Sequence, residues 1–266
     1  MTDKAASERR PGRFLWLERA DDDFPFYAGQ PLALSGRQWS VVLGSTLAAF
    51  LILTLAGPLV TKMLGPNPVA RVLVAGVFAG LPLLALARTA PHGWRLLFRP
   101  ITGRDILVMV GFAALTLVVT STIALTLLQF LHMTVNPIVN VKLDGITAKL
   151  GFLALTAVQL MGEELLTVLP FLAILTLGFG RFGMGRRAAI TLAWLGSSLV
   201  FALAHLPTYN WNLLQCLLVV GAVRLVLTLA YVRTKNLWVS VGAHILYDWT
   251  IFGLVTLIGM AGMPQG

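Results

Sequence analysis

The sequence has few charged residues and a single cysteine. Only 12% of its 266 residues are Asp, Glu, Lys or Arg, whereas about 25% is usual in soluble globular chains, and 57% are hydrophobic. The one cysteine, Cys216, lies in an apolar run, which excludes a disulfide framework and a cysteine-ligated zinc site. Residues 1–38 are mostly polar and lack the features of a secretory signal, so we expect no cleaved leader. This composition is that of a polytopic membrane protein.

Long apolar segments make up most of the chain. A helix needs about 20 apolar residues to cross the hydrocarbon core of a bilayer, and seven segments have or approach that length. They are residues 40–61, 69–90, 105–135, 149–177, 188–206, 212–232 and 237–260. We therefore predict an all-α bundle of about seven transmembrane helices. The third and fourth segments are long enough to be split, so eight crossings are the alternative, and Pro170 predicts a kink in the fourth.

The basic residues are distributed unevenly between the two sides that this topology implies. Fifteen Lys and Arg residues fall in the tail and in alternate connections, and four fall on the other side. The basic connections are residues 88–104, 181–187 and 233–235. Because cytoplasmic loops carry the excess of Lys and Arg, we predict a cytoplasmic N-terminus and an external C-terminus. Topology thus accounts for the net charge of +9, and we expect no nucleic-acid partner.

Six ionisable residues lie at membrane depth in the predicted helices. A charge there costs at least about 2.5–3.5 kcal/mol on insertion scales, so each is a candidate functional residue. They are Glu163, Glu164, His205, Arg224, His244 and Asp248. Their number on several helices favours a functional site over helices held together only by mutually neutralised charges.

The spacing of these residues suggests how they are arranged. His244 and Asp248 are four residues apart, as are Phe201 and His205, so each pair shares one helical face. Glu163 and Glu164 are adjacent and point about 100° apart, so we expect them to have different roles.

Carboxylates beside imidazoles in a dry site are compatible with three kinds of chemistry. A glutamate can act as general base toward water, it can join two histidines as a zinc ligand, or it can relay protons in a transporter. Spacing does not choose between these, since no HExxH sequence is present. Counting residues along the helices places Glu163 and His244 in the cytoplasmic half of the membrane but His205 near the outer end of its helix.

Three stretches of sequence together resemble the CPBP family of intramembrane proteases, which includes the CAAX prenyl endopeptidases and the Abi bacteriocin-processing and immunity proteins. The stretches are GEELLTVLPF from residue 162, FALAHLPTYNW from residue 201 and HILYDW from residue 244. They follow the family's EExxxR, FxxxH and HxxxN or HxxxD patterns in order, over roughly residues 150–260. The sequence departs from the family at Val168, which replaces the arginine, and we expect Arg224 to be the partner of Glu164 instead.

The resemblance implies a role for each candidate residue. Glu163 is expected to be the general base and His205 to share the attacking water. His244 and Asp248 are expected to stabilise the oxyanion and orient the site, with Asp248 either holding the His244 tautomer or acting in its protonated form. We expect no metal cofactor; the alternative is zinc held by His205, His244 and Glu163.

Composition and the resemblance together predict a division of the chain and a set of partners. Residues 1–38 would be a cytoplasmic tail, 39–148 the N-terminal membrane helices, 149–260 the catalytic core and 261–266 a C-terminal tail. The acidic run at residues 21–23 is expected to be solvated. We expect an intramembrane endopeptidase in the cell membrane, with lipid and a peptide or membrane-protein substrate as partners. A divergent, noncatalytic immunity or binding protein is the alternative, and a proton-coupled transporter is less favoured because no internal repeat is evident.

Overall fold

A computed structural model describes residues 14, 17–19, 22–64, 68–141, 143 and 145–261. This part of the chain folds into helices and contains no strand. The α-helices are α1 (Gly36–Leu51), α2 (Gly57–Leu64), α3 (Pro68–Thr89), α4 (Gly103–Leu127), α5 (Gly145–Gly180), α6 (Arg186–Ala204), α7 (Leu213–Gln215), α8 (Gly221–Thr234) and α9 (Leu237–Ala261). The predicted all-α polytopic bundle is confirmed.

Each of the seven predicted segments corresponds to one helical rod. A π-helical turn at Ile52–Ala56 joins α1 to α2, and another at Cys216–Val220 joins α7 to α8. The α4 helix ends at Leu127, before the predicted limit, and α5 continues through Pro170 to Gly180, so neither helix is split. Six rods in the described part are long and apolar enough to cross a membrane; α9, which carries His244 and Asp248, is not among them.

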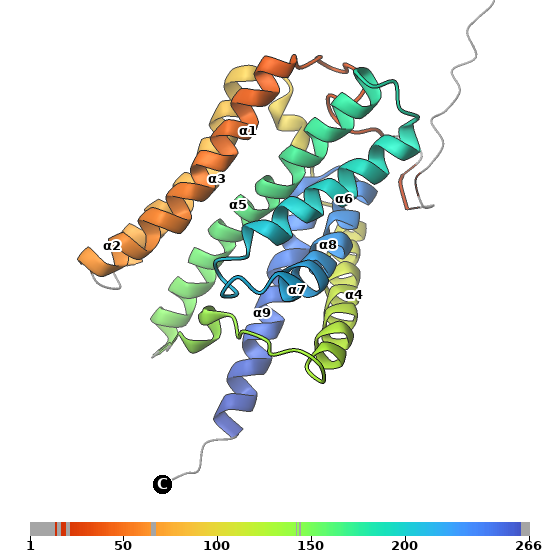
Figure 1. Cartoon of the computed structure of the whole chain (residues 1–266). Coiled ribbons are helices and arrows are strands. Elements are labelled where there is room, and N and C mark those ends of the chain that lie inside the picture. Colours follow the sequence, from red (N-terminus) through yellow and green to blue (C-terminus); the bar gives the residue numbers. More distant parts are fainter. Residues whose placement is uncertain are drawn as a thin grey trace, which may run out of the picture.

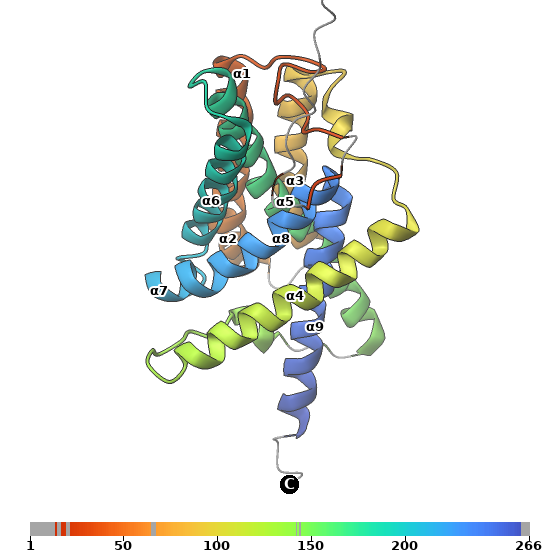
Figure 2. The same cartoon turned by 90° about the vertical axis from the view of Figure 1, so that its right-hand side faces the viewer.

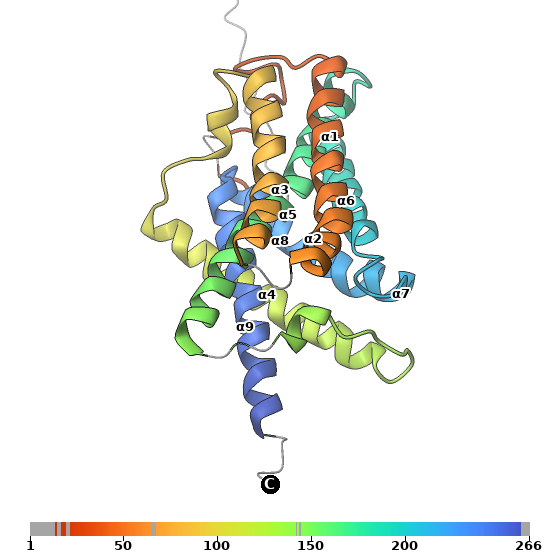
Figure 3. The ribbon, with the colours of Figure 1, turned by 90° about the vertical axis from the view of Figure 1, so that its left-hand side faces the viewer.

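The α5 helix occupies the middle of the bundle, where it packs against α1, α3, α6 and α9 (Figure 1). The α4 helix crosses α9 obliquely and lies alongside α8 (Figure 2). On the other side of the molecule, α1 and α3 lie next to each other (Figure 3). Because α5, α6 and α9 carry the three family-like patterns, this packing brings those patterns together.

Two glycines allow close helix contacts around the central helix. A Cβ atom on Gly162 of α5 would lie 2.3 Å from the ring of Phe78 on α3. A Cβ atom on Gly242 of α9 would lie 2.5 Å from the sulfur of Met109 on α4. The absence of a side chain at these positions lets α3 and α4 pack directly against the helices that carry the acidic and histidine residues.

The described residues that precede α1 pack onto the bundle; we call residues 14, 17–19 and 22–34 the N-terminal clasp. The side chains of Phe14, Phe24, Phe26, Tyr27 and Leu34 are buried in the same core as residues of α5 and α6. The prediction of a solvated tail is therefore wrong for these residues, because their aromatic side chains fill the core at one end of the bundle. Asp21 lies outside the described residues.

Candidate active site

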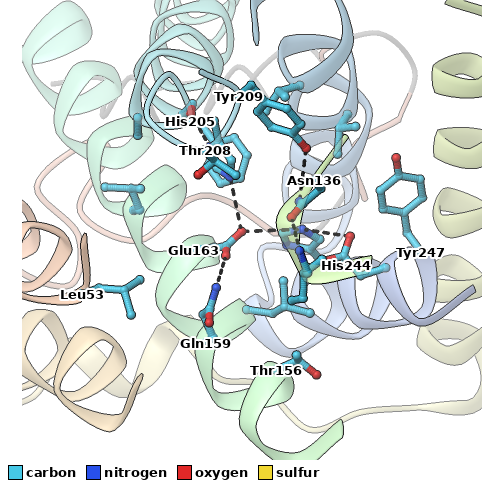
Figure 4. Close-up of a pocket in the computed structure, with 18 of the residues that line it drawn as sticks. Leu53, Asn136, Thr156, Gln159, Glu163, His205, Thr208, Tyr209, His244 and Tyr247 are labelled. Carbon is cyan, nitrogen blue, oxygen red and sulfur yellow. Dashed lines mark hydrogen bonds and ion pairs between the residues drawn. The ribbon is translucent and has the colours of Figure 1, made fainter. Parts of the chain in front are cut away.

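A cavity of about 260 Å³ lies among α1, α3, α5, α6, α8 and α9 and the loop between α4 and α5. Four of the predicted site residues line it: Glu163, His205, His244 and Asp248. In Figure 4 the Glu163 carboxylate lies between the two imidazoles, with Gln159 below it on the same helix. The cavity is the place where the three family-like patterns meet.

Glu163 presents its carboxylate to the cavity with few direct partners. One oxygen accepts a 3.1 Å hydrogen bond from the Gln159 amide. The other, Oε2, lies 3.9 Å from His205 Nε2 and 4.0 Å from His244 Nε2, and the side chain is 14% exposed. These separations are too long for direct hydrogen bonds, but a water placed about 2.8 Å from both Oε2 and an imidazole nitrogen fits them. The arrangement suits a carboxylate that shares a water with histidine.

Hydrogen bonds on the far side of each imidazole fix which nitrogen faces the cavity. His205 Nδ1 lies 2.8 Å from the Phe201 carbonyl oxygen, and His244 Nδ1 lies 2.8 Å from Glu164 Oε1. Carbonyl and carboxylate oxygens only accept, so both Nδ1 atoms carry hydrogen and donate it. Both Nε2 atoms therefore face Glu163. In the neutral imidazole, that nitrogen is an acceptor.

Glu164 has no exposed surface and is fully engaged by other side chains. Besides the His244 bond, it accepts a 2.6 Å hydrogen bond from Arg224 Nη1 on α8 and a hydrogen bond from the Ser240 hydroxyl on α9. The predicted pairing of Glu164 with Arg224 is confirmed. The two adjacent glutamates thus have different surroundings, as their angular separation on the helix predicts.

The cation beside Glu164 comes from α8 because the family's arginine position lies in apolar surroundings here. Val168 is 1% exposed and belongs to the core that also holds the clasp aromatics. The buried Arg224 guanidinium instead lies 5.0 Å from the centre of the Phe201 ring, which in turn packs against His205 at 4.3 Å. Phe201 therefore supports both the relocated cation and the imidazole that follows it by one helical turn.

Asp248 lies farther from its predicted partner than a hydrogen bond requires. Its Oδ1 is 3.8 Å from His244 Nε2, on the cavity side of the ring. The prediction that Asp248 holds the His244 tautomer is wrong, since the Nδ1 hydrogen bond that fixes it is made by Glu164. The reason is the position of the two side chains on α9. Asp248 lies next to the cavity, whereas the Nδ1 atom of His244 points toward α5.

Sequence reasoning missed two residues that hold the glutamates. Gln159 precedes Glu163 by four residues, and Ser240 precedes His244 by four, so each shares a helical face with a predicted site residue. That spacing could have identified both. At the cavity edge, the Asn136 amide donates a 3.3 Å hydrogen bond to the Tyr209 hydroxyl.

The sequence placed Glu163 and His205 at different depths in the membrane, and the fold corrects this prediction. His205 caps the C-terminal end of α6, and Glu163 lies near the midpoint of the long α5 helix. The imidazole and carboxylate meet because α5 and α6 run in opposite directions and the two residues lie at similar distances from the connection between the helices, Glu163 17 residues before Gly180 and His205 19 residues after Arg186. The site therefore lies beside the end of α6 that is remote from Arg186.

The same residues were tested for a fit to zinc. Zinc ligands lie about 2.0–2.2 Å from the metal, which places ligand atoms closer together than the Glu163–histidine distances found here. Across the described residues, no group of three or more His, Cys, Asp or Glu side chains is placed to hold a metal ion. We therefore derive no reaction step through a metal.

Comparison with protein families matches residues 146–250 to the family described as Type II CAAX prenyl endopeptidase Rce1-like. Comparisons with curated proteins and with solved structures each gave no significant match. The matched residues include every predicted acid and histidine of the site, and the family points to a membrane protease. Residues 146–250 are thus similar to the Rce1-like domain, and this match supports a CPBP family intramembrane protease.

Proposed function

We propose that this protein is an intramembrane endopeptidase in which Glu163 activates water for attack on a peptide bond. The observation that carries the proposal is the position of the Glu163 carboxylate, which faces the cavity about 4 Å from two imidazole Nε2 atoms. A carboxylate held in this way combines a general base with neighbours that orient the attacking water.

Each step of the reaction has a group to carry it. Glu163 takes a proton from water while the water oxygen bonds to the substrate carbonyl carbon, and His205 Nε2 orients that water. Protonated at Nε2, His244 donates a hydrogen bond to the resulting oxyanion, and its charge is favoured by Glu164 and Asp248 on either side. The C–N bond then breaks as Glu163 returns its proton to the leaving amine.

Glu164 acts through other residues rather than on substrate. Its bonds to Arg224, Ser240 and His244 tie α5, α8 and α9 together and set the orientation of the His244 ring. Arg224 supplies the cation that Val168 cannot, which favours an active enzyme over a divergent, inactive one.

The cavity lining favours cleavage of an internal bond over removal of terminal residues. Among the described residues that line the cavity, none is Lys or Arg. A free terminal carboxylate therefore has no Lys or Arg partner there, whereas the uncharged main chain of an internal segment needs none.

The proposal is tested with the full chain in proteoliposomes and a pool of fluorogenic peptides. Wild type is compared with Glu163→Gln, His205→Ala and His244→Ala, and with His132→Ala, which removes an exposed imidazole outside the cavity. General-base catalysis contributes about 10²–10⁴-fold, so Glu163→Gln should lose that factor while His132→Ala keeps the wild-type rate.

Two outcomes would overturn parts of this account. Cleavage that survives all three site substitutions would refute a peptidase centred on Glu163. Loss of cleavage on chelation, restored by zinc, would refute the metal-free route described above.

A further inference from the structure

The end of the bundle that carries the basic connections is covered by the N-terminal clasp. Arg186 donates hydrogen bonds of 2.6 and 2.7 Å to the two carboxylate oxygens of Glu18, and Lys235 Nζ lies 2.9 Å from the same carboxylate. Arg186 also bonds to Asp23 at 2.8 Å, and Arg99 pairs with Asp22. The clasp thus joins the α3–α4, α5–α6 and α8–α9 connections at one end of the molecule.

Aromatic side chains of the clasp fill the space beneath these ion pairs. Phe24 packs against Phe171 at 5.4 Å between ring centres, and Tyr27 packs against Phe179 at 4.4 Å. Both partners lie in the second half of α5. This end of the bundle is therefore filled by side chains of the clasp and closed by buried and partly buried ion pairs.

The cavity lies toward the opposite end of the same helices. It is lined by Leu53 in the second half of the first rod, by Gln159 in the first half of α5, and by Asn136 in the loop that precedes α5. Thr208, which follows α6, is exposed at its rim. In Figure 1 the clasp and the beginning of α6 lie at one end of the bundle, and α7 and the α4–α5 loop lie toward the other.

We propose that the site receives its substrate from the non-cytoplasmic side of the membrane, as a peptide segment of a membrane-anchored or translocated protein. The clasp covers the basic connections. The excess of Lys and Arg in these connections assigns their side of the bundle to the cytoplasm. A cavity that faces away from them is reached from the outer leaflet. This inference rests on the proposed peptidase function only for the nature of the substrate, since the sidedness follows from the cavity and the charge distribution.

Sidedness is tested by cysteine labelling of the full chain in right-side-out membrane vesicles. In a Cys216→Ala background, Thr208→Cys places a thiol at the cavity rim. Phe182→Cys is the matched control, exposed in the α5–α6 connection at the clasp end. A charged, membrane-impermeant maleimide should label Thr208→Cys in intact vesicles and Phe182→Cys only after permeabilisation. The reverse pattern, or equal labelling of both before permeabilisation, would overturn the proposal.

Substrate access is then tested with the same fluorogenic peptides, supplied outside the vesicles or sealed within them. Cleavage of the external peptides alone supports the proposal, and cleavage of the sealed peptides alone overturns it. The labelling is repeated with Glu163→Gln, because labelling does not require activity. Outward labelling without any cleavage would therefore refute the peptidase function while leaving the sidedness intact.

Discussion

The N-terminal clasp and the candidate active site both bury glutamates next to basic or imidazole groups, but they satisfy those glutamates to different extents. Glu18 accepts from both Arg186 nitrogens and from the Phe14 backbone, and pairs with Lys235. Among the described residues, Glu163 accepts one side-chain hydrogen bond, from Gln159, and faces a cavity. A saturated carboxylate holds structure, whereas one with free acceptor capacity can take up a proton from water.

Glu164 resembles Glu18 more than its own neighbour. It is buried, paired with an arginine and bonded by two further side chains. The comparison therefore separates two adjacent residues of one sequence pattern into an acid that holds structure and the acid that we propose is reactive. Substitutions on each side of that division should have different consequences.

The largest effect on stability is expected from Arg224→Ala. It would leave the Glu164 carboxylate buried without its cation, and breaking a buried pair costs about 3–5 kcal/mol of unfolding free energy. Chemical unfolding in mixed micelles measures this, with the exposed Lys149→Ala as control. A stable Arg224→Ala protein would show that Glu164 does not depend on this cation.

A smaller effect on stability, and none on the reaction, is expected from Arg186→Ala. It removes the double hydrogen bond to Glu18 and the bond to Asp23, which together should lower the unfolding free energy by about 2 kcal/mol. Arg181→Ala, exposed at the same end, should change it by less than about 0.5 kcal/mol. Equal stability of Arg186→Ala and Arg181→Ala would contradict a structural role for the clasp.

A tenfold effect on catalysis is expected from Gln159→Ala. Losing the hydrogen bond that positions Glu163 should cost about 1.4 kcal/mol, or tenfold, in kcat, with KM and stability little changed. The matched control is Thr176→Val, on the same helix but distant from the cavity. An unchanged kcat, or a fall in stability that accounts for the loss, would argue against a positioning role.

The smallest effect is a pH dependence of the clasp. Burial raises the pKa of the Glu18 carboxyl, but hydrogen bonds from Arg186 and Lys235 outweigh burial and hold the pKa below its ordinary value of 4.5. The ion pairs therefore contribute fully above about pH 4.5 and are lost as the pH falls through the lowered pKa. Thermal unfolding across this range should show a steeper loss for wild type than for Glu18→Gln. An equal loss of thermal stability with falling pH in wild type and Glu18→Gln would contradict the assignment of this pH dependence to Glu18.

Hydropathy and spacing were sufficient to predict the helices and most of the site. Seven apolar segments became seven rods, whereas the count along the helices placed His205 away from Glu163, and it was the order of the three family-like patterns that brought His205 and His244 together with Glu163. The partner of Glu164 could be predicted because Arg224 is the one arginine at membrane depth, whereas Arg71 and Arg88 lie at the ends of their predicted span. These features depend on local periodicity and on the cost of charge in a membrane.

The remaining features depend on contacts between distant segments. Phe14, Phe24 and Tyr27 have the sequence surroundings of an ordinary polar tail, and only the filled end of the bundle shows why they are buried. Likewise, the loss of the family's arginine at Val168 is explained by the apolar core around that position. When one helix supplies a cation in place of another helix, the change leaves no periodic pattern in a single sequence.

The most direct test of the division between reactive and structural acids is the ratio of peptide cleavage rates for Glu163→Gln and Glu18→Gln, measured side by side in proteoliposomes at equal amounts of folded protein. Both substitutions replace a buried or half-buried carboxylate by its neutral amide. We expect Glu18→Gln to retain the wild-type rate and Glu163→Gln to fall by about 10²–10⁴-fold. Equal rates for the two variants would contradict the assignment of Glu163 as the catalytic base.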